Sequence, residues 1–260
     1  MIRHFSIWAI ASSLALAAAP APEPLIRLLD RTGARVDQFW QDFASVSCLE
    51  TVTQVKLEPS GKVLTRKQAT FDYVILIQVS DADVTVDESR MQQGKPPKAS
   101  ERALLATSGF STLALILHPH FQDSFQFAEL QDGNQPGRPV RHVRFEHIRG
   151  RRSPSVLQLR GREYPIEWRG EAWIDAATGA IARIHAELKA PMADVGMQKL
   201  SSDVSYSPVG LKGAAEAPWL PERATIEAAT ERQRWQNVHL FSRYRQFSVD
   251  TEVHTEAPKQ

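Results

Sequence analysis

The residues best suited to chemistry are two histidines, His118 and His120, on either side of a proline. Imidazole is a common metal ligand, but a protein metal site needs three or four ligands held by further hydrogen bonds. No cysteine and no pair of acids stands near these histidines in the sequence. We therefore expect a helix end with surface imidazoles there and no metal site.

Motifs of catalytic use are absent from the sequence. There is no Gly-x-Ser-x-Gly nucleophile elbow, no His-Glu-x-x-His zinc motif and no phosphate-binding loop. The acid pairs Asp81/Asp83 and Asp87/Glu88 fall in polar segments, where solvated surface is the ordinary role. We predict no catalytic residue and no cofactor, and an enzyme is the least favoured class of function.

An arginine-rich segment is the most pronounced charge feature of the chain. Residues 138–169 contain nine arginines, three glutamates and no lysine. Guanidinium groups bind phosphate and carboxylate groups through paired hydrogen bonds. Arg144, Arg151 and Arg160 are therefore candidates for a surface that binds an anion or a partner. The alternative is that these arginines keep the outer face of several strands soluble and pair with acids elsewhere.

The first residues have the three-part pattern of a secretory signal peptide. Arg3 gives a positive start, residues 5–19 are uncharged and largely apolar, and residues 17–21 are small residues or proline. A membrane-spanning helix needs about 20 apolar residues, and this run is shorter. We predict a cleaved signal over residues 1–21, a periplasmic or secreted protein, and no transmembrane segment in the mature chain.

Charge balance and cysteine content bear on nucleic-acid binding and on disulfide formation. The chain has 31 Lys and Arg against 30 Asp and Glu, and removal of residues 1–21 takes away only Arg3. A neutral mature chain has no general attraction to nucleic acids, so we expect no nucleic-acid partner. Cys48 is the one cysteine. It cannot form an intrachain disulfide, and we expect its thiol to be buried.

Two segments carry helical periodicity. Between Leu25 and Phe43, apolar residues recur at spacings of three and four, which predicts an amphipathic helix that covers a sheet. Gly33 is a candidate break in this helix. A short helix is predicted over residues 112–117, with Ser111 as its N-cap and the His118-Pro119 pair at its end.

Most other segments have the two-residue period of strands. Residues 48–57 and 62–70 flank a Pro- and Gly-containing turn and predict a hairpin. Residues 71–79 are apolar on both faces, as in a strand covered on both sides, and 81–88 form an edge strand. The most C-terminal strand is long and should bend or bulge near Arg245-Gln246. The remaining strands are predicted over residues 123–130, 140–149, 155–159, 164–169, 171–175, 180–188, 199–206, 223–230 and 234–253.

These elements predict a mainly β fold of the α+β class. About nine to eleven antiparallel strands would form one large curved sheet or half-barrel, with an N-terminal helix and a short internal helix covering its concave face. No linker divides the mature chain. We therefore expect a single domain over residues 22–254 and a disordered tail over residues 255–260.

A hairpin at residues 170–181 has the sequence GEAWIDAATGAI. It resembles a hairpin of the lipoprotein-carrier superfamily of bacterial envelope proteins. That superfamily includes the periplasmic outer-membrane lipoprotein sorting protein, its outer-membrane receptor and a periplasmic regulator of the sigma-E stress response. The resemblance implies an open, strongly curved half-barrel with helices at its mouth and acyl chains held in an apolar cavity.

Two functional hypotheses remain open at this point. In the first, the protein is an exported soluble binding protein for a hydrophobic or lipid-like ligand or a lipidated protein. Its ligand-contacting residues would then be Phe71, Tyr73, Ile75, Trp173 and Ile184. In the second, it is a structural or interaction protein that docks an envelope partner through the arginine-rich strand surface.

Overall fold

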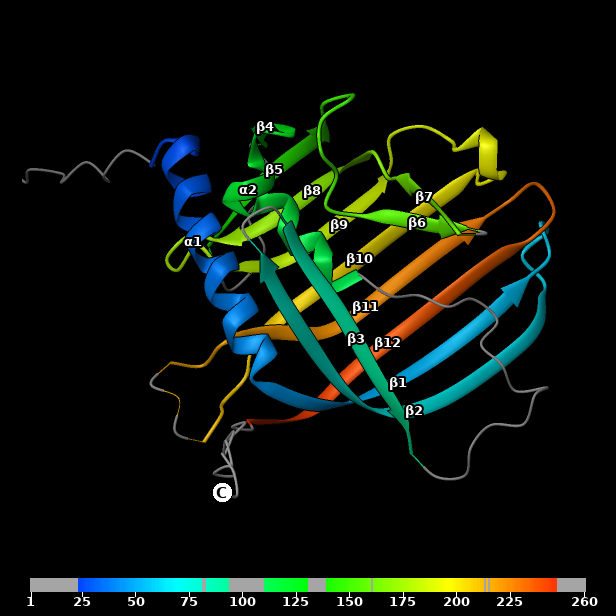
Figure 1. The fold of residues 1–260 in the computed structure, drawn as a ribbon, viewed down its shortest axis with the longest axis horizontal. Helices are drawn as coiled ribbons and strands as arrows, with labels where there is room; N and C mark the ends of the chain where they lie inside the picture. The colour runs from blue at the N-terminus through cyan, green and yellow to red at the C-terminus, as the bar shows by residue number, and fades with distance from the viewer. Residues whose placement is uncertain are drawn as a thin grey trace, which may run out of the picture.

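The computed structural model describes residues 23–80, 83–93, 110–130, 139–159, 161–212, 214 and 216–246. The predicted signal peptide, the predicted tail and Arg160 lie outside the described residues. Within them, ten antiparallel strands form one open sheet, and an N-terminal helix lies across it (Figure 1). The predicted fold class is confirmed.

Helix α1 (Leu25–Ala44) forms where the apolar periodicity predicts it. It runs through Gly33 without a break, because Gly33 belongs to its buried face. A Cβ atom there would come within 3.0 Å of Pro119 and Gln122, so the glycine lets the short helix α2 (Pro119–Gln122) approach closely. The buried residues of α1 are Leu28, Leu29, Thr32, Gly33, Val36, Phe39, Trp40 and Phe43.

The main sheet joins the first long strand to the last, in the order β3-β2-β1-β12-β11-β10-β9-β8-β5-β4. Hairpin β6–β7 forms a separate two-stranded sheet. The strands are β1 (Val46–Leu57), β2 (Val63–Ser80), β3 (Asp83–Gln92), β4 (Phe125–Leu130), β5 (Val140–His147), β6 (Val156–Leu159), β7 (Arg162–Pro165), β8 (Trp168–Asp175), β9 (Ile181–Leu188), β10 (Lys199–Pro208), β11 (Trp219–Ala229) and β12 (Arg234–Gln246).

Two strands differ instructively from the prediction. Residues 62–70 and 71–79 belong to one continuous strand, β2, which lies between β1 and the edge strand β3. The bulge of β12 lies at Arg243 and Tyr244, two residues before its predicted place, because both oppose Cys48 of β1. Arg243 takes the left-handed backbone conformation, with φ of 54°, that such a kink needs.

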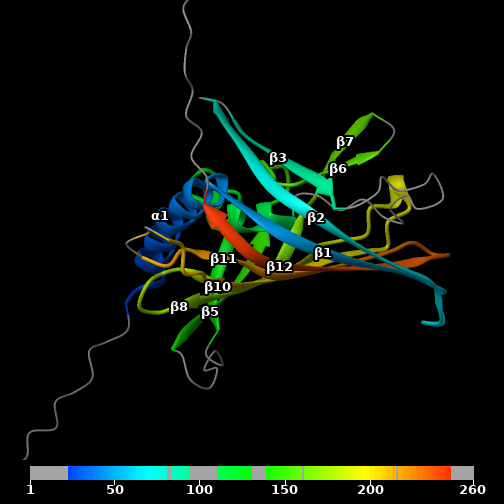
Figure 2. The same ribbon diagram turned by 90° about the horizontal axis from the view of Figure 1, so that it is seen from below.

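Side chains on one face of the sheet form the core, and we call this the concave face. Ile184, Val204 and Ala224 are opposite one another on β9, β10 and β11, and all three are fully buried. Helix α1 covers one end of this face, where Phe39 contacts Tyr206 at a ring distance of 5.7 Å. The 3-10 helix η2 (Phe110–Leu117) contacts the same strands and α1, and Figure 2 shows α1 on one side of the sheet. The predicted short helix is therefore present as a 3-10 helix, but it begins at Phe110, so Ser111 lies inside it and is not its N-cap.

The hairpin turn that follows β8 anchors α1. Arg31 donates hydrogen bonds to the carbonyl oxygens of Ala176 and Ala177, and Arg35 donates to that of Thr178. Within the turn, Asp175 accepts hydrogen bonds from the backbone N–H groups of Ala177 and Thr178. The GEAWIDAATGAI hairpin thus has a structural role, since its turn fixes the helix across the sheet.

Candidate functional site

Four of the five predicted ligand residues lie on the concave face. Phe71, Tyr73 and Ile75 alternate along β2, and Ile184 lies on the same face of β9, five strands away. Tyr73, Ile75 and Ile184 are completely buried in the hydrophobic core, and Phe71 is half-buried. The four residues therefore belong to one apolar surface, although three of them serve its packing.

Trp173 lies on the opposite, outer face of the sheet. Its neighbours Ala172 and Ile174 point into the core. The indole stacks on the imidazole of His142, at a centroid distance of 4.6 Å, and the guanidinium of Arg183 lies 4.6 Å from the indole centre. These partners come from the strands on either side, β5 and β9. The structure does not bring Trp173 together with the other four residues.

A buried charged cluster occupies the concave face of β1, β3 and β12. Arg90 donates to both carboxylate oxygens of Glu50, from Nε at 2.6 Å and from an Nη at 3.1 Å. His239 Nδ1 lies 2.7 Å from Glu50 Oε1. The other Nη of Arg90 lies 2.8 Å from Glu88, and the guanidinium lies over the Tyr73 ring at 4.9 Å. Arg90 thereby ties the edge strand to strands further inside the sheet.

The charge state of Glu50 follows from these contacts. Burial raises its pKa, but the hydrogen bonds from His239 and Arg90 and the positive charge of Arg90 outweigh burial and hold the pKa below its ordinary value. Glu50 is therefore an ionised acceptor, and His239 donates through Nδ1. No sequence motif predicts this cluster, although Glu50 is in phase with the buried residues Val46, Cys48 and Val52 of β1.

Cys48 is buried beside this cluster, as predicted. Burial and the nearby charge of Glu50 raise the pKa of its thiol to about 12. The thiolate is the reactive form, so we expect Cys48 in the folded protein to resist iodoacetamide at pH 8 and to react rapidly in urea. Mass spectrometry of the alkylated protein measures both rates. Equal rates in the two conditions would contradict the buried position.

Beyond the helices, the concave face carries apolar side chains that are only half-buried. Leu200 of β10, Ala228 of β11 and Trp235 of β12 are cross-strand neighbours in one row. Leu200 and Trp235 are half-buried. This row lies at the opposite end of β10 from Tyr206, where α1 packs. Leu157 of hairpin β6–β7 also packs on the core while half-buried, so this end of the face is the less covered one in the described structure.

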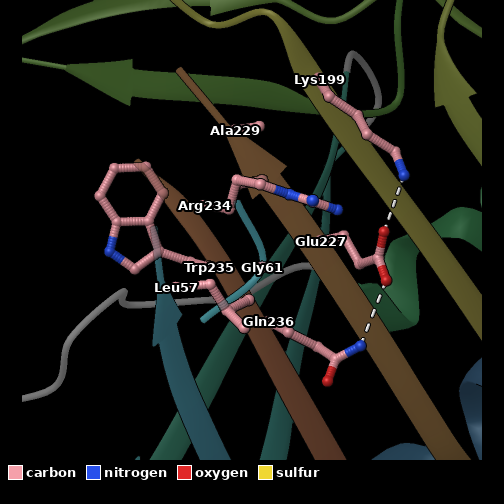
Figure 3. Close-up of a pocket in the computed structure, with 9 residues that line it drawn as sticks. Leu57, Gly61, Lys199, Glu227, Ala229, Arg234, Trp235 and Gln236 are labelled. Atoms are coloured by element: carbon pink, nitrogen blue, oxygen red, sulfur yellow. Dashed lines mark hydrogen bonds and ion pairs between the residues drawn. The ribbon is translucent and has the colours of Figure 1, made fainter. Parts of the chain in front are cut away.

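A small polar pocket lies near the same end of the strands. It has a volume of about 270 Å³, and its walls include Leu57 and Gly61 from the β1–β2 hairpin. Figure 3 shows Lys199, Glu227 and Gln236 joined in a chain, with Lys199 donating to Glu227 at 2.7 Å and Gln236 donating at 3.2 Å. These groups satisfy one another, and the pocket lining also includes Ala228 and Trp235 of the half-buried row.

Some arginines of the strands pair with acids on neighbouring strands. Arg141 binds Glu129, and Arg169 lies 2.8 Å from Glu187. Of the predicted partner-binding residues, Arg144 is exposed on the outer face of β5 and Arg151 is exposed in the turn after β5, while Arg160 is not described. The described structure therefore brings Arg144 and Arg151 to different elements.

The two histidines of the first motif have partners of their own. His118 Nε2 lies 2.6 Å from Asp37 of α1, and its Nδ1 accepts the backbone N–H of His120. His120 contacts Arg152 through Nε2. Among the described residues, no group of three or more His, Cys, Asp or Glu side chains is placed to hold a metal ion. Nor does the described part of the chain contain a helix long and apolar enough to span a bilayer.

Comparison with known proteins gives a distant structural likeness. No protein-family model and no curated protein matches the sequence. The chain is similar to the crystal structure of a DUF1329 family protein from Desulfovibrio piger, with 15% sequence identity and a TM-score of 0.43. The match covers 86% of this chain and 93% of that one.

Proposed function

We propose that the protein binds a hydrophobic, lipid-like ligand, or the acyl chains of a lipidated protein, on the concave face of its sheet. The observation that carries this proposal is the half-buried row of Leu200 and Trp235, at the end of the face away from α1. Water contact with such side chains is unfavourable, and an apolar ligand would relieve it. Export through the signal at residues 1–21, to the periplasm or outside the cell, is part of the same proposal.

The size of the row indicates the size of the ligand. The row crosses three strands, which is about 10 Å at the usual strand spacing. Ten extended methylenes have a similar length, and burying each contributes about 0.8 kcal/mol. The loss of translational and rotational freedom on binding takes several kcal/mol from this sum of roughly 8 kcal/mol, so such a chain alone would bind more weakly than the micromolar range. A single acyl chain therefore matches this row in length.

We expect Leu200→Asp to weaken binding of a dansyl-labelled fatty acid at least about tenfold, because a carboxylate there would have to be desolvated by the bound chain. Leu240→Asp is the matched control. Leu240 is 46% exposed and lies on the outer face of β12, between the buried residues His239 and Phe241. Fluorescence titration measures both variants. Equal fatty-acid affinities of the Leu200→Asp and Leu240→Asp variants would show that the ligand does not bind on the concave face.

Native mass spectrometry tests the proposal without a chosen ligand. Protein purified from an envelope fraction under mild conditions should carry a lipid-sized adduct that organic extraction removes. If the adduct is absent and the labelled fatty acid does not bind the extracted protein, the proposed function fails.

The second candidate function is docking of an envelope partner through arginines, and the exposed turn that contains the predicted residue Arg151 favours it. On the strands, Arg141 and Arg169 pair with acids. In the turn after β5, Arg149 and Arg151 are exposed and make no ion pair with described residues. A docking surface for an envelope partner would therefore include this turn.

A further inference from the structure

An acid-free basic segment joins β5 to the tip of hairpin β6–β7. From His147 to Arg162 the sequence contains five arginines and no aspartate or glutamate. Arg149, Arg151 and Arg162 are exposed, and none of them makes an ion pair with the described residues. Their positive charge is therefore available to a partner.

The backbone that presents these arginines is fixed by hydrogen bonds. Ile148 N donates to Ser124 O at 2.8 Å, and Arg151 N donates to Ile148 O at 3.1 Å. Ser153 Oγ donates to Ile166 O at 2.6 Å and so ties the turn to the approach of β8. A turn held in this way loses little backbone freedom when its side chains meet an anionic surface.

Hairpin β6–β7 adds exposed aliphatic side chains to these charges. Val156 is 47% exposed and Leu159 is 40% exposed, and the two lie on opposite faces of β6. Leu159 is the cross-strand neighbour of Arg162, so an aliphatic group and a guanidinium stand side by side at the hairpin tip. Leu157, two residues before Leu159, packs on the core. The hairpin lies on the same side of the sheet as α1 in Figures 1 and 2.

We propose that the turn at residues 148–155 and hairpin β6–β7 form a docking surface for anionic lipid headgroups. Arginines bind phosphate through their forked donors, and exposed aliphatic residues can enter the boundary between headgroups and acyl chains. The combination of unpaired arginines with isolated aliphatic residues favours a lipid surface over an acidic protein. The inference rests on the proposed function in one respect, since it places the less covered end of the concave face next to the source of its ligand.

Vesicle sedimentation tests the docking surface directly. At low salt, the protein should bind vesicles of equal parts phosphatidylcholine and phosphatidylglycerol, and should not bind phosphatidylcholine alone. We expect Arg149→Ala/Arg151→Ala to weaken this binding about 25-fold, roughly fivefold for each arginine near the surface. High salt should abolish most of the binding of the unaltered protein.

The matched control is Arg223→Ala/Arg232→Ala, which removes the same charge from exposed positions on β11 and the following turn. It should bind vesicles as the unaltered protein does. An equal loss in both double variants would mean that net charge alone is responsible, and the proposed surface would be wrong. Binding of soluble polyglutamate in the absence of vesicle binding would instead identify an acidic protein as the partner.

The two proposals fail separately. Arg149→Ala/Arg151→Ala should bind the labelled fatty acid normally when no vesicles are present, whereas Leu200→Asp should bind vesicles normally. Failure of the docking surface appears as unchanged vesicle binding in the arginine variant. Failure of the ligand site appears as unchanged fatty-acid binding in Leu200→Asp. Thermal unfolding followed by circular dichroism checks that each variant is folded.

Discussion

Replacement of Glu50 by alanine is expected to lower the free energy of unfolding by about 3–5 kcal/mol, the usual cost of removing one partner of a buried ion pair. The carboxylate is fully buried and accepts hydrogen bonds from Arg90 and His239. Without it, the Arg90 guanidinium keeps Glu88 but loses its closest partner, and His239 Nδ1 loses its acceptor. Urea denaturation followed by circular dichroism measures the difference.

Glu187→Ala is the control for this prediction. Glu187 pairs with Arg169 on the outer face, where both side chains are exposed to solvent. Exposed pairs contribute about 0–1 kcal/mol, so this variant should unfold almost like the unaltered protein. Equal losses for Glu50→Ala and Glu187→Ala would show that burial adds nothing to the importance of Glu50.

The same carboxylate links stability to pH. Because the folded-state pKa of Glu50 is lowered, its contribution is fully present above the unfolded-state pKa of a glutamate, about 4.3. The contribution is lost as the pH falls below that value, through the folded-state pKa. Glu50→Gln should therefore flatten the acid limb of the stability curve, measured as urea midpoints between neutral and acidic pH.

Gly170→Ala is expected to cost about 3 kcal/mol or more, through a clash with backbone rather than with a movable side chain. A Cβ atom at this position on β8 would lie 1.9 Å from the carbonyl oxygen of His185 and 2.8 Å from the ring of Phe145. Neither contact can be relieved without separating β8 from its neighbours or displacing a fully buried ring. Thermal unfolding measures the loss.

Gly210→Ala provides the contrast. A Cβ atom at Gly210 has no heavy atom within 4 Å, and the residue does not need a positive φ. Alanine there should be neutral or slightly stabilising, by up to about 1 kcal/mol, because it restricts the unfolded chain. If the two alanine variants unfolded at the same temperature, the close packing at Gly170 would not affect the stability of the sheet.

Local patterns of apolar residues predict most of the helices and strands of the fold. The three- and four-residue spacing of Leu28, Val36 and Phe43 predicts α1 because one helix face must be buried. Gly33 was misread as a candidate break because its small size serves the contact with α2, a tertiary reason that lies outside its own helix. Likewise, the sequence of β2 predicts two segments because its first half is polar and its second half is apolar. The backbone of β2 nevertheless pairs with β1 from Val63 to Val74.

The candidate site was less accessible from the sequence, for two different reasons. Trp173 was assigned to the ligand set although Ala172 and Ile174 alternate with it, so the two-residue period already placed it on the other face. The cluster of Glu50, Arg90 and His239 depends on pairings between strands far apart in the chain, which no local pattern contains. The one local signal is that Glu50, a charged residue, alternates in phase with the buried residues of β1, which predicts a buried ion pair.

The pairing of β1 with β12 also fixes the order in which the molecule can be assembled. Residues as far apart as Val46 and Gln246 are neighbours in this ladder, and the contact between Glu50 and His239 closes across 189 positions of the chain. During synthesis, the outer edge of β1 in the β1–β2–β3 meander stays unpaired until β12 has left the ribosome. The ladder between β1 and β12, which joins the β1–β2–β3 meander to the rest of the sheet, can therefore form only after translation of β12 is complete, and contacts of such long sequence separation make that step slow.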